Sequence, residues 1–190
     1  LLREQTLWGI YRLIDRRQSP SYQPGSNVVH IFVCGAMAPE AVEAGRLLEQ
    51  EGIFANVFNV TGPGPLYRHF QHSIDDVMHG RSGRSHFLEN MISRGERQAN
   101  LVTVIDGHPH ALAWIGSALG MTTFPLGVTR FGQSGSRADL YREYQIDVSS
   151  IVTACRKALE ESIATGIAEG VSCRGGQGIK SGKGKPGKNP

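Results

Sequence analysis

Three residues capable of acid–base and metal-binding chemistry follow one apolar stretch of the chain. Residues 101–105 are apolar or β-branched, and Asp106, His108 and His110 come directly after them at alternate positions. Such a group could hold a divalent metal, or a histidine oriented by the carboxylate could act as a general base. It could also form a tight turn in which Asp106 caps the next helix and the histidines pack at an interface. We favour this structural interpretation and keep the other two as hypotheses.

A second polar segment surrounds a glycine-containing turn further along the chain. Arg130 precedes the sequence Phe-Gly-Gln-Ser-Gly-Ser, and Arg137 follows it at the start of a predicted helix. Cationic side chains near a helix N-terminus can bind an anion. The chain has no nucleophile-elbow or phosphate-loop motif, and this turn lacks the third glycine of a dinucleotide fingerprint. The candidate interface or anion site comprises Asp106, His108, His110, Arg130, Gln133, Ser134 and Arg137.

The elements that could position these residues follow from the spacing of the apolar side chains. Residues 28–34 are apolar on both alternating faces apart from His30, as in a central strand covered by helices on both sides. The segment 39–51 has helical apolar spacing and a charged outer face, and the strand pattern after it predicts a right-handed parallel βαβ unit. We predict strands over residues 9–14, 28–34, 55–60, 101–105 and 122–128, and helices over 39–51, 66–78, 86–92, 111–119, 137–144 and 150–165.

The predicted fold class is α/β, with three layers (α/β/α) and a mixed, mostly parallel sheet of about five strands whose first strand is antiparallel. Pro125 places the last strand at a sheet edge. Prolines in the stretch 61–65 remove amide donors, so we interpret it as a turn and not as a phosphate cradle. His69 and His72 have helical spacing but no matching acid or cysteine, which favours solvated side chains over a metal site. We interpret His30 as a strand residue that is satisfied locally.

Composition and charge bound the class of protein. Hydrophobic residues make up 39% of the 190 residues, and no apolar run approaches the roughly 20 residues that span a bilayer. The basic residues of the glycine-rich tail outnumber the net charge of +3, so the rest of the chain is mildly acidic. We therefore expect neither a nucleic-acid nor a membrane partner. We assign residues 1–170 to one domain and residues 171–190 to a disordered basic tail.

The cysteines and the first residues suggest where the protein is found and what else it contains. Cys34, Cys155 and Cys173 are scattered, which favours a reducing, cytoplasmic compartment over a disulfide scaffold. The chain starts Leu-Leu-Arg without Met or a recognisable leader. We therefore expect it to be a fragment of a longer protein.

The order of these elements, together with three sequence segments, resembles a known domain. Gly9–Leu13, Leu126–Arg137 and Tyr144–Asp147 are similar to the C-terminal domain of the homodimeric decarboxylating component of pyruvate dehydrogenase, in the transketolase superfamily. The resemblance covers about residues 7–166, and the Phe-Gly-x-Ser turn is its most specific part. Gln133 stands where these enzymes usually have Arg, and the segment from Asp106 to His110 replaces a Thr-Asp-Tyr type of sequence.

The resemblance implies a cofactor and partners, but no catalytic residue in this chain. In the superfamily, thiamine diphosphate lies between the first and middle domains, and a Gly-Asp-Gly motif holds its diphosphate through Mg²⁺. No Gly-Asp-Gly occurs in these 190 residues. The resemblance therefore implies that the site of this oxidoreductase lies upstream of Leu1, that this chain alone binds no cofactor and is inactive, and that no catalytic, cofactor-binding or metal residue is carried over.

The partners that the resemblance implies are the N-terminal and middle domains of the same enzyme, a homodimer partner and, in some members, the acyltransferase component. The domain would support dimer and domain packing. Three alternatives stay open at this point: a fragment of a transketolase-type enzyme, a stand-alone module that binds an anion or partner, and a small zinc enzyme using His108 and His110.

Overall fold

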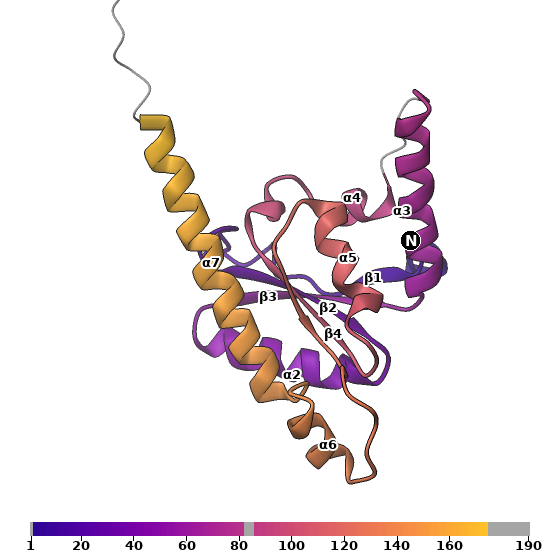
Figure 1. Ribbon diagram of the computed structural model, residues 1–190. Helices are drawn as coiled ribbons and strands as arrows, with labels where there is room; N and C mark the ends of the chain where they lie inside the picture. Colours follow the sequence, from indigo (N-terminus) through magenta and orange to yellow (C-terminus); the bar gives the residue numbers. More distant parts are fainter. Residues whose placement is uncertain (1, 82–85, 175–190) are drawn as a thin grey trace, which may run out of the picture.

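A five-stranded mixed sheet lies at the centre of the computed structural model, which describes residues 2–81 and 86–174, with side chains as far as Thr165 in the last helix (Figure 1). The strand order is β1-β3-β2-β4-β5, in which β1 is antiparallel to β3 and the other neighbours are parallel. These observations confirm the predicted sheet and its antiparallel first strand. The strands are β1 (Ile10–Ile14), β2 (Val28–Cys34), β3 (Phe54–Val60), β4 (Leu101–Ile105) and β5 (Thr123–Leu126).

The central and edge strands have the residue types that their places require. Six of the seven residues of β2 are buried, because helices cover both faces of this strand. Pro125 lies in β5, at the edge of the sheet, where its missing amide costs no ladder hydrogen bond to a further strand. The prediction of an edge strand at this proline is therefore confirmed.

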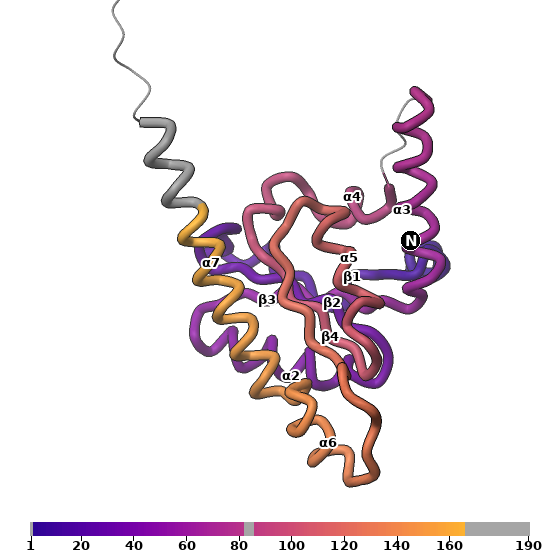
Figure 2. The backbone as a smooth tube through the Cα atoms, viewed as in Figure 1, coloured from indigo at the N-terminus to yellow at the C-terminus, as the bar shows by residue number. Residues whose placement is uncertain are grey.

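Helices cover both faces of the sheet (Figures 1 and 2). Helices α2 and α7 pack on one face, where their buried residues join those of β2, β3 and β4 in one hydrophobic cluster. Leu66, Leu88 and Ile115, from α3, α4 and α5, belong to a second cluster on the other face. The helices are α1 (Leu2–Trp8), α2 (Ala38–Gln50), α3 (Pro63–Met78), α4 (Phe87–Met91), α5 (His110–Leu119), α6 (Arg137–Glu143) and α7 (Val148–Arg174), with short 3₁₀ helices η1 (Gly35–Met37) and η2 (Glu96–Gln98).

Several element boundaries differ from the predictions. Helix α1 was not expected, and α3 begins at Pro63, inside the stretch 61–65 that we interpreted as a turn. The first turn of a helix needs no amide donors, so prolines are accepted there. Helix α7 continues to Arg174. Residues 82–85, which include part of the expected loop after α3, and residues 175–190 of the basic tail lie outside the described residues. None of the described helices is long and apolar enough to cross a membrane.

The chain changes direction across the sheet between β2 and β4. From β2 the chain passes through α2 to β3 on one side, whereas from β4 it passes through α5 to β5 on the other side. Cys34 and Ile105, the last residues of β2 and β4, are register partners. In open α/β sheets, ligands commonly bind outside the carboxyl ends of the strands at such a point. Asp106 follows directly, so the predicted site residues begin at this position.

Candidate functional site

Asp106 lies beside the turn that follows β2. Its Oδ1 atom is 3.4 Å from the position that a Cβ on Gly35 would take, and Gly35 has a φ of +65°. The N-cap residue of α5 is Pro109, with no side-chain cap. Our expectation that Asp106 caps this helix is therefore wrong, because its carboxylate lies against η1 and not over the first turn of α5.

The end of β5 packs directly on the turn that carries the two histidines. The Val128 amide donates to the Gly107 carbonyl at 2.8 Å, and the Ala111 amide donates to the His108 carbonyl at 3.0 Å. A Cβ on Gly127 would lie 2.6 Å from the Gly107 oxygen. The absence of a side chain at Gly127 therefore allows the close approach that fixes this turn.

The two histidines of the turn contact each other. Their ring centroids are 4.7 Å apart in an edge-to-face arrangement, and the His110 amide points at His108 Nδ1 at 3.4 Å. Across residues 2–81 and 86–174, no three His, Cys, Asp or Glu side chains are grouped so that they could hold a metal ion. The geometry thus provides a histidine pair without the ligand set that a zinc site requires.

Tyr141 of α6 connects two other predicted residues. Partial burial raises the pKa of its hydroxyl, the charges of Glu40 and Asp106 raise this pKa further, and Arg137 opposes them. Asp106 and Arg137 therefore act on the same phenol, although Asp106 follows β4 and Arg137 begins α6. The predicted residues Asp106 and Arg137 are brought into one neighbourhood at the carboxyl edge of the sheet.

The loop before α6 is held by Tyr144. The Gln133 amide donates to the Tyr144 hydroxyl at 3.1 Å, and this hydroxyl donates to the Phe131 carbonyl at 3.1 Å. Arg130 donates to both the carbonyl and the carboxylate of Glu143, at 3.0 and 2.9 Å. Ser136 caps α6 by accepting from the Asp139 amide. Arg130 thus stabilises the loop and is already paired with the Glu143 carboxylate.

Four of the seven predicted residues line three separate depressions. His110 lines a depression between α3 and α5, Arg130 lines a second depression beside β5, and Gln133 and Ser134 line a third beside α6. Asp106, His108 and Arg137 border none of these three. The carboxyl edge is therefore a polar surface with several shallow hollows, and the seven side chains do not converge on one cavity.

The depression that contains His110 was not expected from the sequence. It has a volume of about 360 Å³ and is lined by Pro63, Gly64, Tyr67, His110, Ala111 and Trp114. Tyr67 and Trp114 form its aromatic walls, with ring centroids 5.0 Å apart. These residues come from the first two turns of α3 and of α5, which are far apart in the sequence, so no local pattern indicates the depression.

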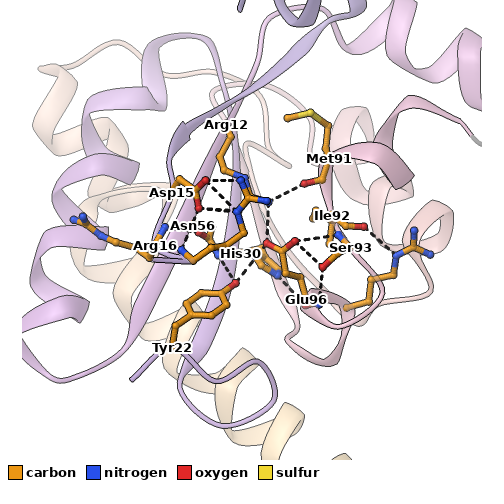
Figure 3. A network of polar contacts seen from close by, with 12 residues as sticks. Arg12, Asp15, Arg16, Tyr22, His30, Asn56, Met91, Ile92, Ser93 and Glu96 are labelled. Carbon is orange, nitrogen blue, oxygen red and sulfur yellow. Dashed lines mark hydrogen bonds and ion pairs between the residues drawn. The ribbon is translucent and has the colours of Figure 1, made fainter. Parts of the chain in front are cut away.

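A buried polar network lies at the opposite, amino-terminal end of the strands (Figure 3). Arg12 of β1 donates to Glu96 Oε1 at 2.8 Å and to the Met91 carbonyl at 2.7 Å, and its guanidinium lies 4.5 Å from the ring centroid of Phe58. Only 8% and 5% of the Arg12 and Glu96 side chains are exposed. This ion pair joins the first strand to the segment before β4.

His30 is part of this network. It is fully buried, its Nε2 donates to the Glu96 carbonyl at 3.0 Å, and its Nδ1 faces the Asn56 side-chain amide at 3.4 Å. Burial lowers the pKa of His30 to about 4. His30 is a strand residue whose two ring nitrogens have polar partners, as interpreted, but these partners are distant in sequence and not local.

One sequence signal could have indicated part of this network. Ser93-Arg94-Gly95-Glu96 matches the Ser-x-x-Glu pattern of a capping box, and both reciprocal hydrogen bonds are present in the turn that leads into η2. The pattern locates the short helix, but it does not indicate that Arg12 is the partner of Glu96.

Comparison with known proteins is informative at the level of structure alone. No protein-family model matches the chain, and no curated protein matches it by sequence. The three-layer α/β/α fold is similar to that of a domain found in solved transketolases. Transketolase from Leishmania mexicana has a TM-score of 0.57 and 18% identity, over 83% of this chain and 19% of that chain. Transketolase from Pichia stipitis in complex with sedoheptulose-7-phosphate has a TM-score of 0.54 and 15% identity over the same shares. The chain therefore spans about a fifth of the length of these solved transketolases.

Proposed function

We propose that the chain is the C-terminal, non-catalytic domain of a thiamine diphosphate-dependent 2-oxo acid dehydrogenase component of the pyruvate type. In this proposal the domain supports domain packing and dimer formation in a cytoplasmic oxidoreductase. Its partners are the N-terminal and middle domains of the same enzyme and the second subunit, and the acyltransferase component docks nearby.

The observation that carries the proposal is the combination of fold and turn. A transketolase-like fold covers 83% of this chain. Within it, the segment 126–137, whose Phe-Gly-x-Ser turn is the most specific part of the resemblance to the pyruvate enzymes, forms the braced loop and capped helix start at the carboxyl edge. Fold alone does not assign chemistry, so the turn is what favours the pyruvate-type enzymes.

The described residues do not fit the thiamine diphosphate and magnesium site of such an enzyme. The sequence contains no Gly-Asp-Gly, and no described group of three His, Cys, Asp or Glu could hold the metal. We therefore assign no catalytic step to this chain, and the proposal locates the cofactor in the rest of a longer protein.

Two experiments test the proposal. The coding sequence upstream of Leu1 should continue in frame for several hundred codons and encode Gly-Asp-Gly followed by Asn, whereas a start codon just before Leu1 would contradict it. Calorimetric titration of the 190-residue chain with thiamine diphosphate and Mg²⁺ should give no heat of binding. A micromolar affinity would locate the cofactor in this chain and reject the assignment.

A transketolase-type enzyme is the second candidate, because solved transketolases match the fold. The two candidates differ in the reaction of the longer protein. A pyruvate-type enzyme should reduce ferricyanide when supplied with pyruvate, whereas a transketolase should transfer a two-carbon unit from a ketose phosphate to an aldose phosphate. The reaction that is observed decides between them.

A further inference from the structure

The depression between α3 and α5 has a fixed aromatic wall. The Trp114 ring is flanked by Tyr67, edge-to-face at 5.0 Å, and by Phe70, stacked at 5.5 Å. Phe70 is in turn backed by the buried His86 at 5.3 Å. Because rings on two helices hold each other in place, the wall is formed before any ligand arrives.

The wall offers a largely apolar surface, with the Tyr67 hydroxyl as its polar group. The indole Nε1 of Trp114 already donates to the Ala111 carbonyl at 3.0 Å, within the same helix. Pro63 and Gly64 lie on the α3 side, where the absence of a side chain at Gly64 keeps the hollow open. A volume of about 360 Å³ is within the range of small-molecule sites.

A cationic side chain lies next to the depression on its α3 side. One Nη atom of Arg68 lies 3.6 Å from the position that a Cβ on Gly64 would take, so the guanidinium lies beside Gly64, just outside the lining residues. His110 lines the α5 side, and none of the lining residues is acidic. Arg68 forms no salt bridge with a described acid, in contrast to Arg130, which is paired with Glu143.

From these contacts we propose that the depression is a binding site for a small ligand with a flat, apolar body and one anionic group. The flat body lies against Trp114 and Tyr67, and the carboxylate, sulfonate or phosphate pairs with Arg68. The proposal goes beyond a packing role for the domain and does not depend on the identity of the longer enzyme.

A different occupant would use the same surface in another way. An apolar segment of a longer polypeptide, or a second copy of the chain, would cover Tyr67 and Trp114 without needing the charge of Arg68. Dependence on that charge therefore separates the proposed ligand from a protein occupant.

Fluorescence can test the proposal, because Trp8 and Trp114 are the two tryptophans of the chain. In a Trp8→Phe background, Trp114 is the remaining tryptophan, so its fluorescence reports binding against its own ring. We would titrate the 190-residue chain with the anionic probe 1-anilinonaphthalene-8-sulfonate and with the neutral probe N-phenyl-1-naphthylamine, which has the same aromatic body. Saturable quenching of Trp114 by both probes, with tighter binding of the anion, is the expected result.

Variants distinguish the contribution of the Arg68 charge to binding from that of the aromatic surface. Arg68→Gln should weaken the anionic probe about tenfold or more and leave the neutral probe unchanged, because a charge-assisted hydrogen bond is lost. Ala111→Leu, which fills the hollow from an exposed position, should weaken both probes. Arg142→Gln, an exposed arginine of α6, is the matched control and should change neither.

Two outcomes would overturn the proposal. One is the absence of saturable quenching in a chain whose near-ultraviolet circular dichroism shows native packing. The other is an Arg68→Gln variant that binds both probes as the parent does, which would assign the surface to an apolar protein partner. Both readouts are independent of thiamine diphosphate, so failure here leaves the proposed function standing, and the reverse also holds.

Discussion

Polar side chains are buried in a network at the amino-terminal end of the parallel strands and exposed at their carboxyl-terminal end. At the amino-terminal end, Arg12, Glu96 and His30 are buried and bonded to one another or to nearby main-chain groups. At the carboxyl-terminal end, Asp106 and His110 are exposed, and His110 lies at the border of a shallow hollow. The first arrangement holds distant segments together, whereas the second leaves charge available for contacts outside the chain.

The difference has an energetic basis. A buried charge is tolerated when a partner and additional hydrogen bonds replace water, and removing one partner leaves the other uncompensated. An exposed charge keeps its water, so its removal costs little. We therefore expect mutations at the amino end to change stability and mutations at the carboxyl edge to change binding while the fold remains intact.

The largest effect is expected from Arg12→Ala. This change leaves the buried Glu96 carboxylate without its cation and should lower the free energy of unfolding by about 3–5 kcal/mol. Urea denaturation followed by circular dichroism would measure it. The control is Arg142→Ala, whose exposed pair with Asp139 should contribute about 0.5 kcal/mol or less. Equal losses in the two variants would refute the contrast between the two ends.

The second-largest effect is expected from acid, which should destabilise the network around His30 at the amino-terminal end of the strands. Burial lowers the pKa of His30 from 6.5 to about 4, so between these values the folded protein binds fewer protons than the unfolded chain. The contribution of His30 is complete above pH 6.5 and is lost as the pH falls towards 4. The loss should reach about 3 kcal/mol, at 1.36 kcal/mol for each pKa unit. Protonation of His30 would also place a second proton on Nδ1. This atom faces the Asn56 side-chain amide, which is itself a hydrogen-bond donor.

Unfolding titrations at several pH values between 7 and 4.5 would measure this loss. His30→Gln should flatten the dependence, and His72→Gln, at an exposed position of α3, should retain it. The pKa of Glu96 is also lowered, in part by Arg12, so its contribution is lost in the same direction at still lower pH. A stability that rises on acidification would contradict the neutral, buried state of His30.

At the carboxyl edge, Gly127→Ala is expected to have the third-largest effect on stability. The added Cβ would lie 2.6 Å from the Gly107 oxygen and 2.9 Å from the Pro109 nitrogen, so the histidine turn must shift. We expect a loss of about 1–3 kcal/mol, as for other overpacked sites. Gly132→Ala, with open space around it, is the matched control. If both variants keep the stability of the parent, the close contact between β5 and the turn is not a structural requirement.

The distance in sequence between interacting residues explains which features could be predicted from the sequence. The strands, most of the helices and the edge position of β5 follow from local patterns, because apolar runs and a proline act within a few residues. The caps at Ser136 and Asp147 are local as well, since each side chain accepts from an amide three residues further on. Helix α1 has no buried residue and gives no such pattern.

Features that depend on distant contacts were not predictable in this way. Arg12 and Glu96 are 84 residues apart, and no local signal pairs them. The seven candidate residues were grouped because they follow strand ends, yet the path of the loop pairs Arg130 with Glu143 and turns Ser134 towards another hollow. The aromatic depression requires two helices from different parts of the chain.

The smallest expected effect is at the loop before α6, where Tyr144→Phe removes one hydroxyl that serves two main-chain groups. Loss of its hydrogen bonds to Gln133 and Phe131 should cost about 1 kcal/mol, as for single hydrogen bonds in other proteins. The stronger readout is local, because the Gln133 amide loses its acceptor and should exchange its hydrogen faster.

Hydrogen exchange at the Gln133 amide, read by mass spectrometry or NMR, would measure this change. Tyr67→Phe is the matched control, since no hydrogen bond is found for the Tyr67 hydroxyl among the described residues, and it should leave the Gln133 amide unchanged. Phe131, whose side chain is 96% exposed, depends on the same bracing for its position. If Gln133 exchanges equally in the parent and in Tyr144→Phe, the loop is not held by this hydroxyl, and the carboxyl edge is less ordered than the contrast with the amino end assumes.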